Sequence, residues 1–425
     1  MSAAPIADAP LRVDQVVMEF SLKGGIEAVA FELQRAFRAA GVDSRVVTSV
    51  ADDGAPDVER IAPVLARIGT RGAWRHAGRA LAVPLFTLAA TAFLRAARRQ
   101  GAGRVVLSHG DTLAGDVCVV HAVNRANLDA KRASGAWRWR LNPLHHWVSL
   151  RDRVMIGGLR FRRYVALSER IVDELQRYYG VPRDRIALIP NGVNLDRFAP
   201  LPDDRAATRA ALGLPPDAPV LLFVGHEFDR KGLAHAIDAL ALLSDGGARL
   251  VVVGAGQAAP FRHQARRLGV GERVLFTGAR GDLPQLYRAA DAFVFPTAYE
   301  SFSLTCMEAM ACGLPVLAPA CGGIEDYLRD GVNGRVIPRD GAGIAAALAP
   351  VLADPALRAR LGAGALATAA DHAWPRIAER YRALLDEVRR EIAEDGRSRR
   401  TPGRTAVERL HPHRRAAPER LSPCK

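Results

Sequence analysis

The stretch "VLLFVGHEFDRKGLAHAIDAL", Val220 to Leu240, combines an uninterrupted apolar run, a polar loop and a helical pattern. An uninterrupted apolar run is typical of a strand buried on both faces, whereas a strand with one solvated face alternates apolar and polar residues. Such strands belong to parallel sheets, because helical crossovers cover these sheets on both sides. The stretch therefore predicts one strand and the next helix of an open α/β sheet.

The same pattern recurs in both halves of the chain. In the second half the other apolar runs are "RLVVVG" (249–254), "RVLFTG" (273–278), "AFVFP" (292–296) and "PVLAP" (315–319). In the first half they are "RVDQVVMEF" (12–20), "SRVVTSV" (44–50), "RVVLSHG" (104–110), "DVCVVHA" (116–122), "RYVALS" (163–168) and "RIALIPNGV" (185–193). Helical patterns separate the runs, so we predict an α/β protein with two Rossmann-like doubly wound domains that face a cleft.

Prolines and charges cluster in residues 193–220, between the two series of strands and helices. This composition is typical of a domain boundary. We expect a disordered N-terminus (1–10), a first Rossmann-like domain on the acceptor side (11–198), a second one that binds the nucleotide-sugar (199–373), a C-terminal helix that crosses back to the first domain (374–392) and a disordered, Arg- and Pro-rich basic tail (393–425).

Composition narrows the class of protein. With 425 residues and 49% hydrophobic content the chain can bury more than one core. Its five cysteines form no CxxC pair, which favours a reduced cytoplasmic protein over a disulfide framework or a zinc site. The N-terminus lacks the pattern of a secretory signal. A net charge of +14 fits nucleic acid, an anionic small molecule, a phosphorylated acceptor or an acidic membrane face, and does not choose among them.

The longest apolar run is "ALAVPLFTLAATAFL", Ala80 to Leu94, between Arg79 and Arg95. A membrane-spanning helix needs roughly 20 apolar residues, and this run is shorter. We therefore expect a buried helix of the first domain, with membrane insertion as the alternative.

Two predicted loops at the carboxyl ends of strands are suited to binding anions. Gly24 and Gly25 precede a helix expected to begin near Ile26, where backbone amides can approach an anion, although a tight turn explains paired glycines equally well. Arg230 and Lys231 directly precede another predicted helix, where cations oppose the helix dipole. A bound diphosphate would resolve that conflict, and a solvated charge pair is the alternative.

The stretch "FPTAYESFSLTCMEAMACGLPVLA", Phe295 to Ala318, sets Glu300 and Glu308 around a short predicted helix that Ser303 or a neighbour caps. A capping box of Thr305 and Glu308 would explain the second acid structurally. Glu300 has no such explanation, because it lies in the loop after a predicted strand. The helix start offers further free amides to phosphate.

These motifs together carry a resemblance to a known family. The "DRKG" loop, the two glutamates with seven residues between them in "YESFSLTCMEAMACGLPVLA" and the early Gly-Gly turn resemble the family-4 retaining glycosyltransferases of the GT-B fold. The resemblance covers roughly Val13 to Ile392. The first domain is similar to that of the lipopolysaccharide-core glucosyltransferases, because the short loop in "SHGDTLAGDVCVVHAVNR" joins two strands where other members insert a helix.

The resemblance implies a role for each matched residue. Amides of Gly24 and Gly25 would approach the donor diphosphate and the reacting sugar, and Arg230 and Lys231 would neutralise the phosphates. The other implied donor contacts are Glu308 on the ribose, Glu300 on the donor sugar, amides of Ser303, Leu304 and Thr305 on sugar and phosphate, and the loop of Arg280 on the base.

His121 follows a predicted strand of the first domain and matches a position where many family members place a histidine near the anomeric carbon. The lipopolysaccharide-core members tend to carry an aspartate there. His109, at the end of the preceding strand, is a rival, and a purely structural histidine is the alternative for either residue.

The resemblance implies anomer-retaining transfer of a hexose, with UDP-glucose as the expected donor and GDP- or ADP-linked sugars open. The chain contains no Asp-x-Asp, the usual metal-binding motif of the other large glycosyltransferase fold, so we expect neither metal nor cofactor. A nucleotide-sugar epimerase of similar fold is the rival enzyme. A basic nucleic-acid-binding protein is the rival of another class, and we do not expect nucleic acid as a partner.

The segment "NRANLDAKRASGAWRWRLNPLHHWVSLRDR", Asn124 to Arg153, gathers tryptophans and cations in the acceptor-side domain. Tryptophan favours the headgroup region of a bilayer, and cations favour an anionic leaflet. We expect a glycan or glycolipid acceptor such as lipopolysaccharide core, and a cytoplasmic enzyme that binds peripherally to the cytoplasmic face of the inner membrane. A helix with core tryptophans and solvated arginines is the alternative.

Overall fold

The computed structural model describes residues 10–22, 24–52, 57–68, 75–99, 103–133, 140, 142–201, 204–244 and 247–400. Three predicted features lie outside these residues. They are the N-terminus before residue 10, the tryptophans at 137 and 139 of the proposed membrane segment, and the basic tail from residue 401.

The first domain is built on a parallel sheet in the order β5-β3-β1-β6-β7-β8-β9. Consecutive strands lie on both sides of β1, which is the doubly wound pattern. A short pair of strands, β2 with β4, lies beside it. The strands are β1 (Arg12–Val16), β2 (Glu19–Phe20), β3 (Asp43–Thr48), β4 (Val50–Ala51), β5 (Val58–Arg60), β6 (Val105–Ser108), β7 (Val117–Val120), β8 (Arg163–Ala166) and β9 (Ile186–Leu188).

The second domain repeats the design with the order β12-β11-β10-β13-β14-β15. Every residue of the central strand β10 is buried, as its uninterrupted apolar run predicts. The strands are β10 (Val220–Val224), β11 (Arg249–Val253), β12 (Val274–Gly278), β13 (Ala292–Val294), β14 (Val316–Ala318) and β15 (Gly334–Val336). Both described sheets pair in parallel, and the predicted α/β fold with two Rossmann-like domains is confirmed.

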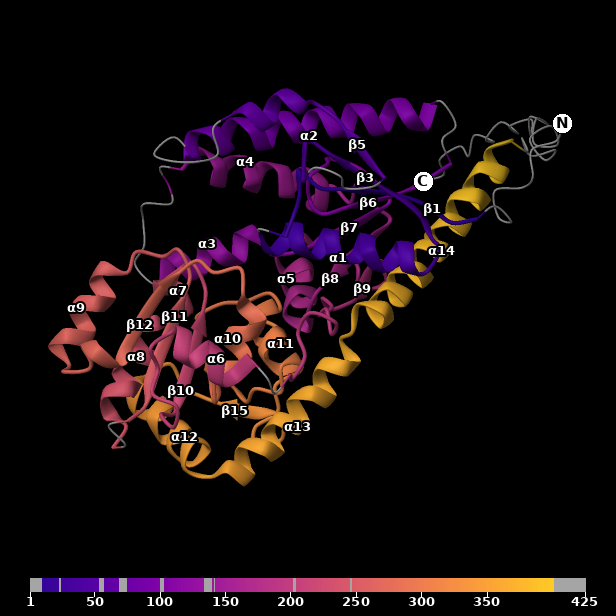
Figure 1. Cartoon of the computed structure of the whole chain (residues 1–425). Coiled ribbons are helices and arrows are strands. Elements are labelled where there is room, and N and C mark those ends of the chain that lie inside the picture. The colour runs from indigo at the N-terminus through magenta and orange to yellow at the C-terminus, as the bar shows by residue number, and fades with distance from the viewer. Residues whose placement is uncertain are drawn as a thin grey trace, which may run out of the picture.

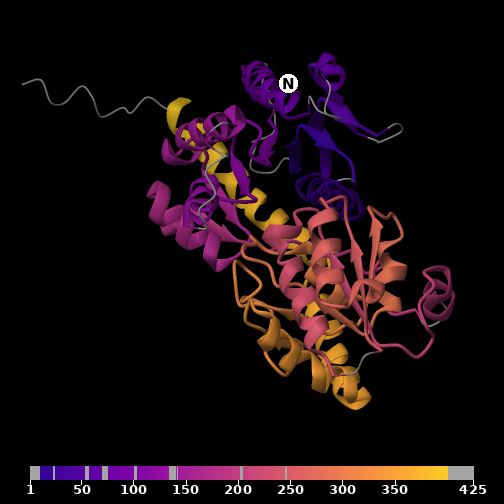
Figure 2. The same ribbon diagram turned by 90° about the vertical axis from the view of Figure 1, so that its left-hand side faces the viewer.

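Helices cover both faces of each sheet, and the two domains form separate lobes (Figure 1, Figure 2). In the first domain and the linker the helices are α1 (Gly25–Ala39), η1 (Pro63–Arg67), α2 (Arg75–Arg99), α3 (Asn124–Ala133), α4 (Pro143–Asp152), the π-helix η3 (Arg153–Gly157), α5 (Glu169–Tyr179), η4 (Arg183–Arg185) and α6 (Asp204–Ala211). In the second they are α7 (Phe228–Lys231), α8 (Leu233–Leu242), α9 (Ala259–Arg267), η5 (Gly271–Arg273), α10 (Leu283–Ala289), α11 (Leu304–Ala311), α12 (Gly341–Ala353) and α13 (Pro355–Asp371).

The last helix, α14 (Trp374–Arg400), runs diagonally along both lobes and packs on α1 and β6 of the first domain (Figure 1). Its apolar side chains, among them Tyr381 and Leu385, join a core cluster that contains residues of both sheets. Arg163 of β8 forms ion pairs with Glu387 and Glu391 near its end. The helix continues beyond Ile392, where the sequence predicted its end, because Glu391 and Asp395 still find arginine partners on the first domain.

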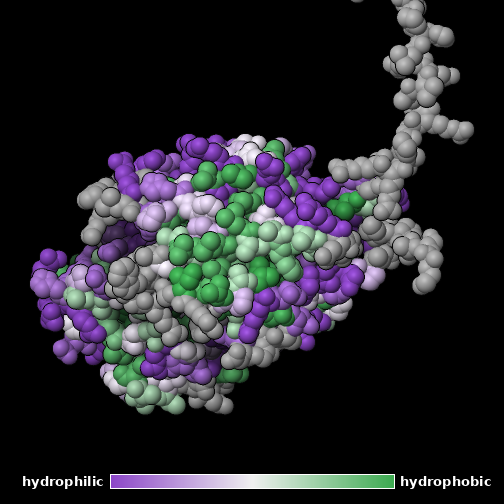
Figure 3. Space-filling view, turned by 90° about the horizontal axis from the view of Figure 1, so that it is seen from above, coloured by the Kyte–Doolittle hydropathy of each residue, from purple (hydrophilic) through white to green (hydrophobic). Residues whose placement is uncertain are grey.

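Helix α2 differs from the buried helix that the sequence predicted. Ala82, Phe86, Ala90 and Leu94 face inward and are buried, three of them in the core beside β1, β3 and β6. Only about a third of the long apolar stretch is buried, however, although its length and composition would suit a membrane span. Figure 3 shows apolar side chains gathered on the face seen from above, where Figure 1 places α2. Only the inner face of α2 is buried, as the sequence predicted for the whole helix.

Substitutions at two buried residues of α14, Tyr381 and Leu385, should change the thermal unfolding midpoint differently. The buried Tyr381 hydroxyl has no hydrogen-bond partner among the described residues, and an unsatisfied buried polar group costs roughly 1–3 kcal/mol. We expect Tyr381→Phe to leave the thermal unfolding midpoint unchanged or to raise it. Leu385→Ala should lower it, because a buried Leu-to-Ala change costs about 2–5 kcal/mol. A marked loss of stability in Tyr381→Phe would contradict this account.

Candidate functional site

All the residues that the sequence singled out for catalysis or donor binding line one cleft of about 480 Å³ between the two domains. The first domain contributes loops that follow β2 and β7, and the second contributes loops that follow β10, β12 and β13. The carboxyl ends of parallel strands lie at one edge of each sheet, and both edges face this cleft. The predicted residues in its wall are Gly24, Gly25, His121, Arg230, Lys231, Arg280, Glu300, Ser303, Leu304, Thr305 and Glu308.

Glu300 has three polar side chains around its carboxylate. Its carboxylate forms an ion pair with Lys231, lies 3.3 Å from the Arg230 guanidinium and accepts a hydrogen bond of 2.8 Å from the Thr297 hydroxyl. The side chain is largely buried. Burial lowers the pKa of Lys231, which the charge of Glu300 opposes. Removing either partner would leave a charge poorly compensated in a dry site.

The cations adopt a different backbone position from the predicted one. Arg230 and Lys231 form the end of the short helix α7, and Gly232 separates them from α8. The Arg230 guanidinium also binds Glu227 at 2.6 Å, and the Lys231 ammonium lies 4.8 Å from the centre of the Phe295 ring. The pair still stands directly before α8, as predicted, and α7 is a single turn of four residues whose dipole cannot hold two cations there. The acids and the aromatic ring hold the pair at the cleft instead.

Glu308 lies on α11 and faces both the cleft and a narrow recess beside it. The Tyr287 hydroxyl donates a hydrogen bond of 3.0 Å to the Glu308 carboxylate. Burial raises the pKa of Glu308 to about 7, and the hydrogen bond from Tyr287 and the charge of Arg197 only partly oppose the rise. Ser303 caps α11, as the sequence predicted, and the alternative of a capping box with Thr305 does not form, because Glu308 binds Tyr287.

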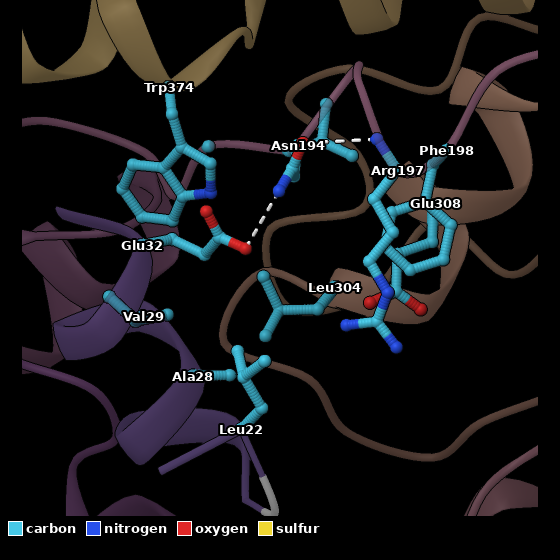
Figure 4. Close-up of a pocket in the computed structure, with 12 residues that line it drawn as sticks. Leu22, Ala28, Val29, Glu32, Asn194, Arg197, Phe198, Leu304, Glu308 and Trp374 are labelled. Carbon is cyan, nitrogen blue, oxygen red and sulfur yellow. Dashed lines mark hydrogen bonds between the residues drawn. The ribbon is translucent and has the colours of Figure 1, made fainter. Parts of the chain in front are cut away.

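Figure 4 shows the recess, with Arg197 and Glu308 on one side of Leu304 and Glu32 and Trp374 on the other. The Asn194 side chain donates a hydrogen bond of 2.9 Å to Glu32 of α1 there. This contact joins the segment after β9 to α1, and it helps to position Arg197 beside Glu308.

Two helix starts point backbone amides at the cleft. In α11 the first helical bond runs from the Met307 amide to the Ser303 carbonyl, so the amides of Leu304 and Thr305 precede it. Ser303 itself has φ = 71°, a rare conformation for a residue with a side chain, and such strain is concentrated at functional sites. In α1 the first bond runs from Ala28 to Gly24. Both ends are ready-made anion sites.

His121 lines the cleft, and His109 lies behind it in the interior. The Nδ1 atom of His109 lies 2.9 Å from Nε2 of His121, and Nε2 of His109 lies 3.1 Å from Oε1 of Gln15. The Gln15 amide nitrogen donates to the Ala30 carbonyl, so its oxygen must accept from His109. In this network neutral His109 accepts at Nδ1, and His121 donates from Nε2.

Both histidines are neutral near pH 7. Burial lowers the pKa of His121 to about 4, and burial with the charge of His121 lowers that of His109 well below its usual value. The lone pair of His121 is therefore on Nδ1. His121 is therefore the histidine that lines the cleft, and His109 is the buried histidine that orients it.

Arg280 lies in the loop after β12, where it is exposed and forms an ion pair with Asp282 at 2.5 Å. Sequence reasoning missed Thr297, which binds Glu300, and Gly322, which supports the Glu300 loop. Gly322 has φ = +53°, and a Cβ there would lie 1.9 Å from the Glu300 carbonyl oxygen. The signal was present, since Thr297 directly follows the apolar run 292–296 and Gly322 lies in the loop after the run 315–319.

Two family models match the chain. The model described as Glycosyltransferase Family 4 covers residues 23–197, and that described as Glycosyl transferases group 1 covers residues 204–367. A D-inositol 3-phosphate glycosyltransferase of Streptomyces bingchenggensis is 41% identical over 231 residues, which are 51% of this chain and 50% of that protein. The one from Nocardia farcinica is 36% identical over 265 residues, 58% of each chain. The chain spans about half the length of these curated relatives.

Solved structures share the fold. WaaG, a glycosyltransferase involved in lipopolysaccharide biosynthesis, superposes with a TM-score of 0.70 at 23% identity, covering 88% of this chain and 99% of its own. Alr3699/HepE of Anabaena, in complex with UDP and glucose, gives a TM-score of 0.62 at 21% identity, covering 91% of this chain and all of its own. At these identities the likeness shows the fold alone.

Because Gly322 contacts the Glu300 backbone, we expect alanine to destabilise the protein more at Gly322 than at Gly331. Gly331 also has positive φ, 71°, but a Cβ there meets nothing within 4 Å. Gly331→Ala should therefore cost only about 1 kcal/mol of conformational strain. We expect Gly322→Ala to lower the thermal unfolding midpoint further and to displace the Glu300 loop in a crystal structure. Equal midpoints for the two variants would refute the proposed support.

Proposed function

We propose that this chain, which belongs to the family-4 glycosyltransferases of the GT-B fold, transfers a hexose from a nucleotide-sugar to a hydroxyl of a glycan or glycolipid acceptor. The carrying observation is the buried Glu300 carboxylate held between Lys231, Arg230 and Thr297 beside the start of α11. Cations and amides suit a diphosphate, and carboxylates suit sugar hydroxyls. A nucleotide-sugar presents both kinds of group at once.

The proposed donor is UDP-glucose, which is supported by the fold shared with a protein solved with UDP and glucose. In this assignment Glu308 accepts hydrogen bonds from the ribose and Glu300 from the donor sugar. Arg230, Lys231 and the amides of both helix starts bind the diphosphate. The loop of Arg280 lies beside the base.

The proposed reaction retains the anomeric configuration and uses no metal. The bond between the anomeric carbon and the diphosphate oxygen breaks, and the acceptor oxygen bonds to the same face of the sugar while its proton passes to the leaving phosphate. Arg230, Lys231 and the amides stabilise the negative charge that grows on the diphosphate. Neutral His121 suits a site beside a sugar ring that becomes positively charged, because a histidinium would repel that charge.

The proposed acceptor is a phosphorylated or lipid-linked glycan, with lipopolysaccharide core as one form. Relatives act on D-inositol 3-phosphate by name, and the structural neighbour WaaG is involved in lipopolysaccharide biosynthesis. The proposed location is the cytoplasmic face of a membrane, where an acceptor with a lipid tail would be held. No nucleic acid takes part in this proposal.

The proposed function is tested by a thermal-shift panel of nucleotide-sugars followed by an NMR analysis of the product. A ligand at about 100 times its dissociation constant adds roughly 2.7 kcal/mol of stability, so the donor should stand out from the panel. Transfer should persist in EDTA and give a product with the donor's anomeric configuration. Lys231→Ala should lower the rate by about 10² to 10³. An inverted product, strict dependence on Mg²⁺ or Mn²⁺, or full activity of Lys231→Ala would overturn the assignment.

Glu308 gives donor binding a predictable dependence on pH. Its folded pKa of about 7 exceeds the usual carboxyl value, so Glu308 gains a proton as the pH falls through 7. The ionised form accepts more hydrogen bonds, and we expect the dissociation constant of UDP-glucose to rise as the pH drops from 8 to 6. His121, with a pKa of about 4, stays neutral over this range.

Calorimetry at several pH values measures this effect. Glu308→Gln should bind the donor weakly and with the same affinity from pH 8 to 6, because the titrating group is gone. A wild-type affinity that does not change over this range would show that Glu308 does not contact the donor.

A further inference from the structure

The outer face of α2 carries a row of exposed leucines. Leu81, Leu85 and Leu88 expose 55%, 42% and 51% of their surface. Their spacing of four and three residues places them on one face of the helix, opposite Ala82, Phe86 and Ala90 in the interior. A soluble helix normally has one polar face, so an apolar outer face indicates a partner.

Neighbouring elements extend this apolar surface. Val64 of η1 and Leu150 of α4 are also strongly exposed, and both elements pack against α2. The space-filling view from above shows a continuous apolar area on this face of the molecule (Figure 3). We call Val64, Leu81, Leu85, Leu88 and Leu150 the α2 surface.

The charges of α2 indicate which partner this is. Residues 75–99 contain no Asp or Glu, whereas arginines occur near both ends of the helix. Arg95 and Arg99 are exposed and continue the leucine row two and three turns beyond Leu88. In a parallel pairing of two copies of α2, Arg95 and Arg99 of one copy would lie against the same arginines of the other. An anionic surface with an apolar layer beneath it matches both features.

We propose that the α2 surface docks the enzyme on an anionic lipid bilayer, with the leucines in the headgroup and acyl boundary and Arg95 and Arg99 on lipid phosphates. Because the inner face of α2 packs on the sheet, the helix lies in the plane of the membrane and does not cross it. Each cation near an anionic leaflet adds about 1 kcal/mol of attraction, and buried leucines add to it.

The position of α2 connects this surface with the cleft. Arg79, near the start of α2, lies close enough to Glu27 in the first turn of α1 for its charge to influence the pKa of that acid. The preceding residues, Gly24 and Gly25, line the cleft. Docking by α2 would therefore bring the acceptor side of the cleft near the bilayer. This functional meaning rests on the proposed lipid-linked acceptor, whereas membrane binding itself does not.

The surface assigned here differs from the segment that the sequence indicated. Asn124 to Arg153 includes α4, which contributes Leu150 to the α2 surface, but the tryptophans at 137 and 139 lie outside the described residues. The run that contains the leucines of α2 was expected to form a buried helix, with membrane insertion as the alternative, and the exposed face of α2 fits neither description.

Vesicle co-sedimentation tests the proposal with the full-length chain. Wild-type protein should bind vesicles of phosphatidylglycerol and phosphatidylcholine, bind pure phosphatidylcholine poorly, and dissociate as salt increases. The variant with Leu81→Gln, Leu85→Gln and Leu88→Gln should lose at least about tenfold in its partition coefficient. Equal binding by this variant overturns the proposal.

The matched control replaces three comparably exposed apolar residues of the second domain, by Leu201→Gln, Leu242→Gln and Val332→Gln. This variant should bind like wild type. If both triple variants lose binding equally, the effect is one of general hydrophobicity and the proposal fails. The proposal also fails if only truncation after Arg400 abolishes binding, since that would assign docking to the basic tail.

A second measurement reads insertion directly. With Cys321→Ser and Cys424→Ser in place, an environment-sensitive dye on Leu85→Cys should shift to the blue with anionic vesicles, and the same dye on Leu242→Cys should not. An unshifted dye at Leu85→Cys overturns the proposal. Concentration-dependent dimers without vesicle binding, seen by analytical ultracentrifugation, would instead assign the α2 surface to a second copy. Neither experiment requires sugar transfer. Membrane binding can therefore be confirmed or refuted even if the proposed function is wrong.

Discussion

The strands pair in parallel in both large sheets, and the site depends on this constraint. Parallel pairing sends the carboxyl ends of neighbouring strands to one edge of the sheet, and with them the loops and helix starts that follow. In the second domain the loops after β10 and β13 meet, because β10 and β13 are direct neighbours. Lys231 and Glu300, far apart in the sequence, form an ion pair for this reason.

That ion pair sets the electrostatic character of the cleft. Lys231 and Arg230 share the Glu300 carboxylate, and Arg230 also pairs with Glu227, so an anionic ligand would compete with these acids for the two cations. The cations contact the acid, a carbonyl and an aromatic ring, so little reorganisation is needed when a diphosphate arrives. Glu308 behaves differently, because its environment raises its pKa towards neutrality. Two acids of the same short stretch therefore serve in two electrostatic settings.

The first domain supplies a neutral wall to this charged cleft. His121 is oriented by His109, which is in turn oriented by Gln15 on β1, so the hydrogen-bond chain links the cleft to the interior of the sheet. On another side of the same domain, α2 combines an interior face with an apolar outer face. A domain of this kind can hold a sugar in its cleft while it contacts a lipid surface.

The sequence by itself determined the two parallel sheets, because strands buried on both faces must be apolar throughout and their runs are therefore visible. It also determined which loops carry the site, since Gly24, Arg230, Glu300 and their neighbours follow those runs directly. Only the tertiary structure decided what these residues contact. Pairing of β10 with β13 brings Lys231 to Glu300, and packing of Tyr287 on α11 assigns Glu308 to a hydrogen bond instead of a cap. The composition of α2 likewise shows that the helix is apolar, but only the tertiary structure shows which of its faces other elements cover.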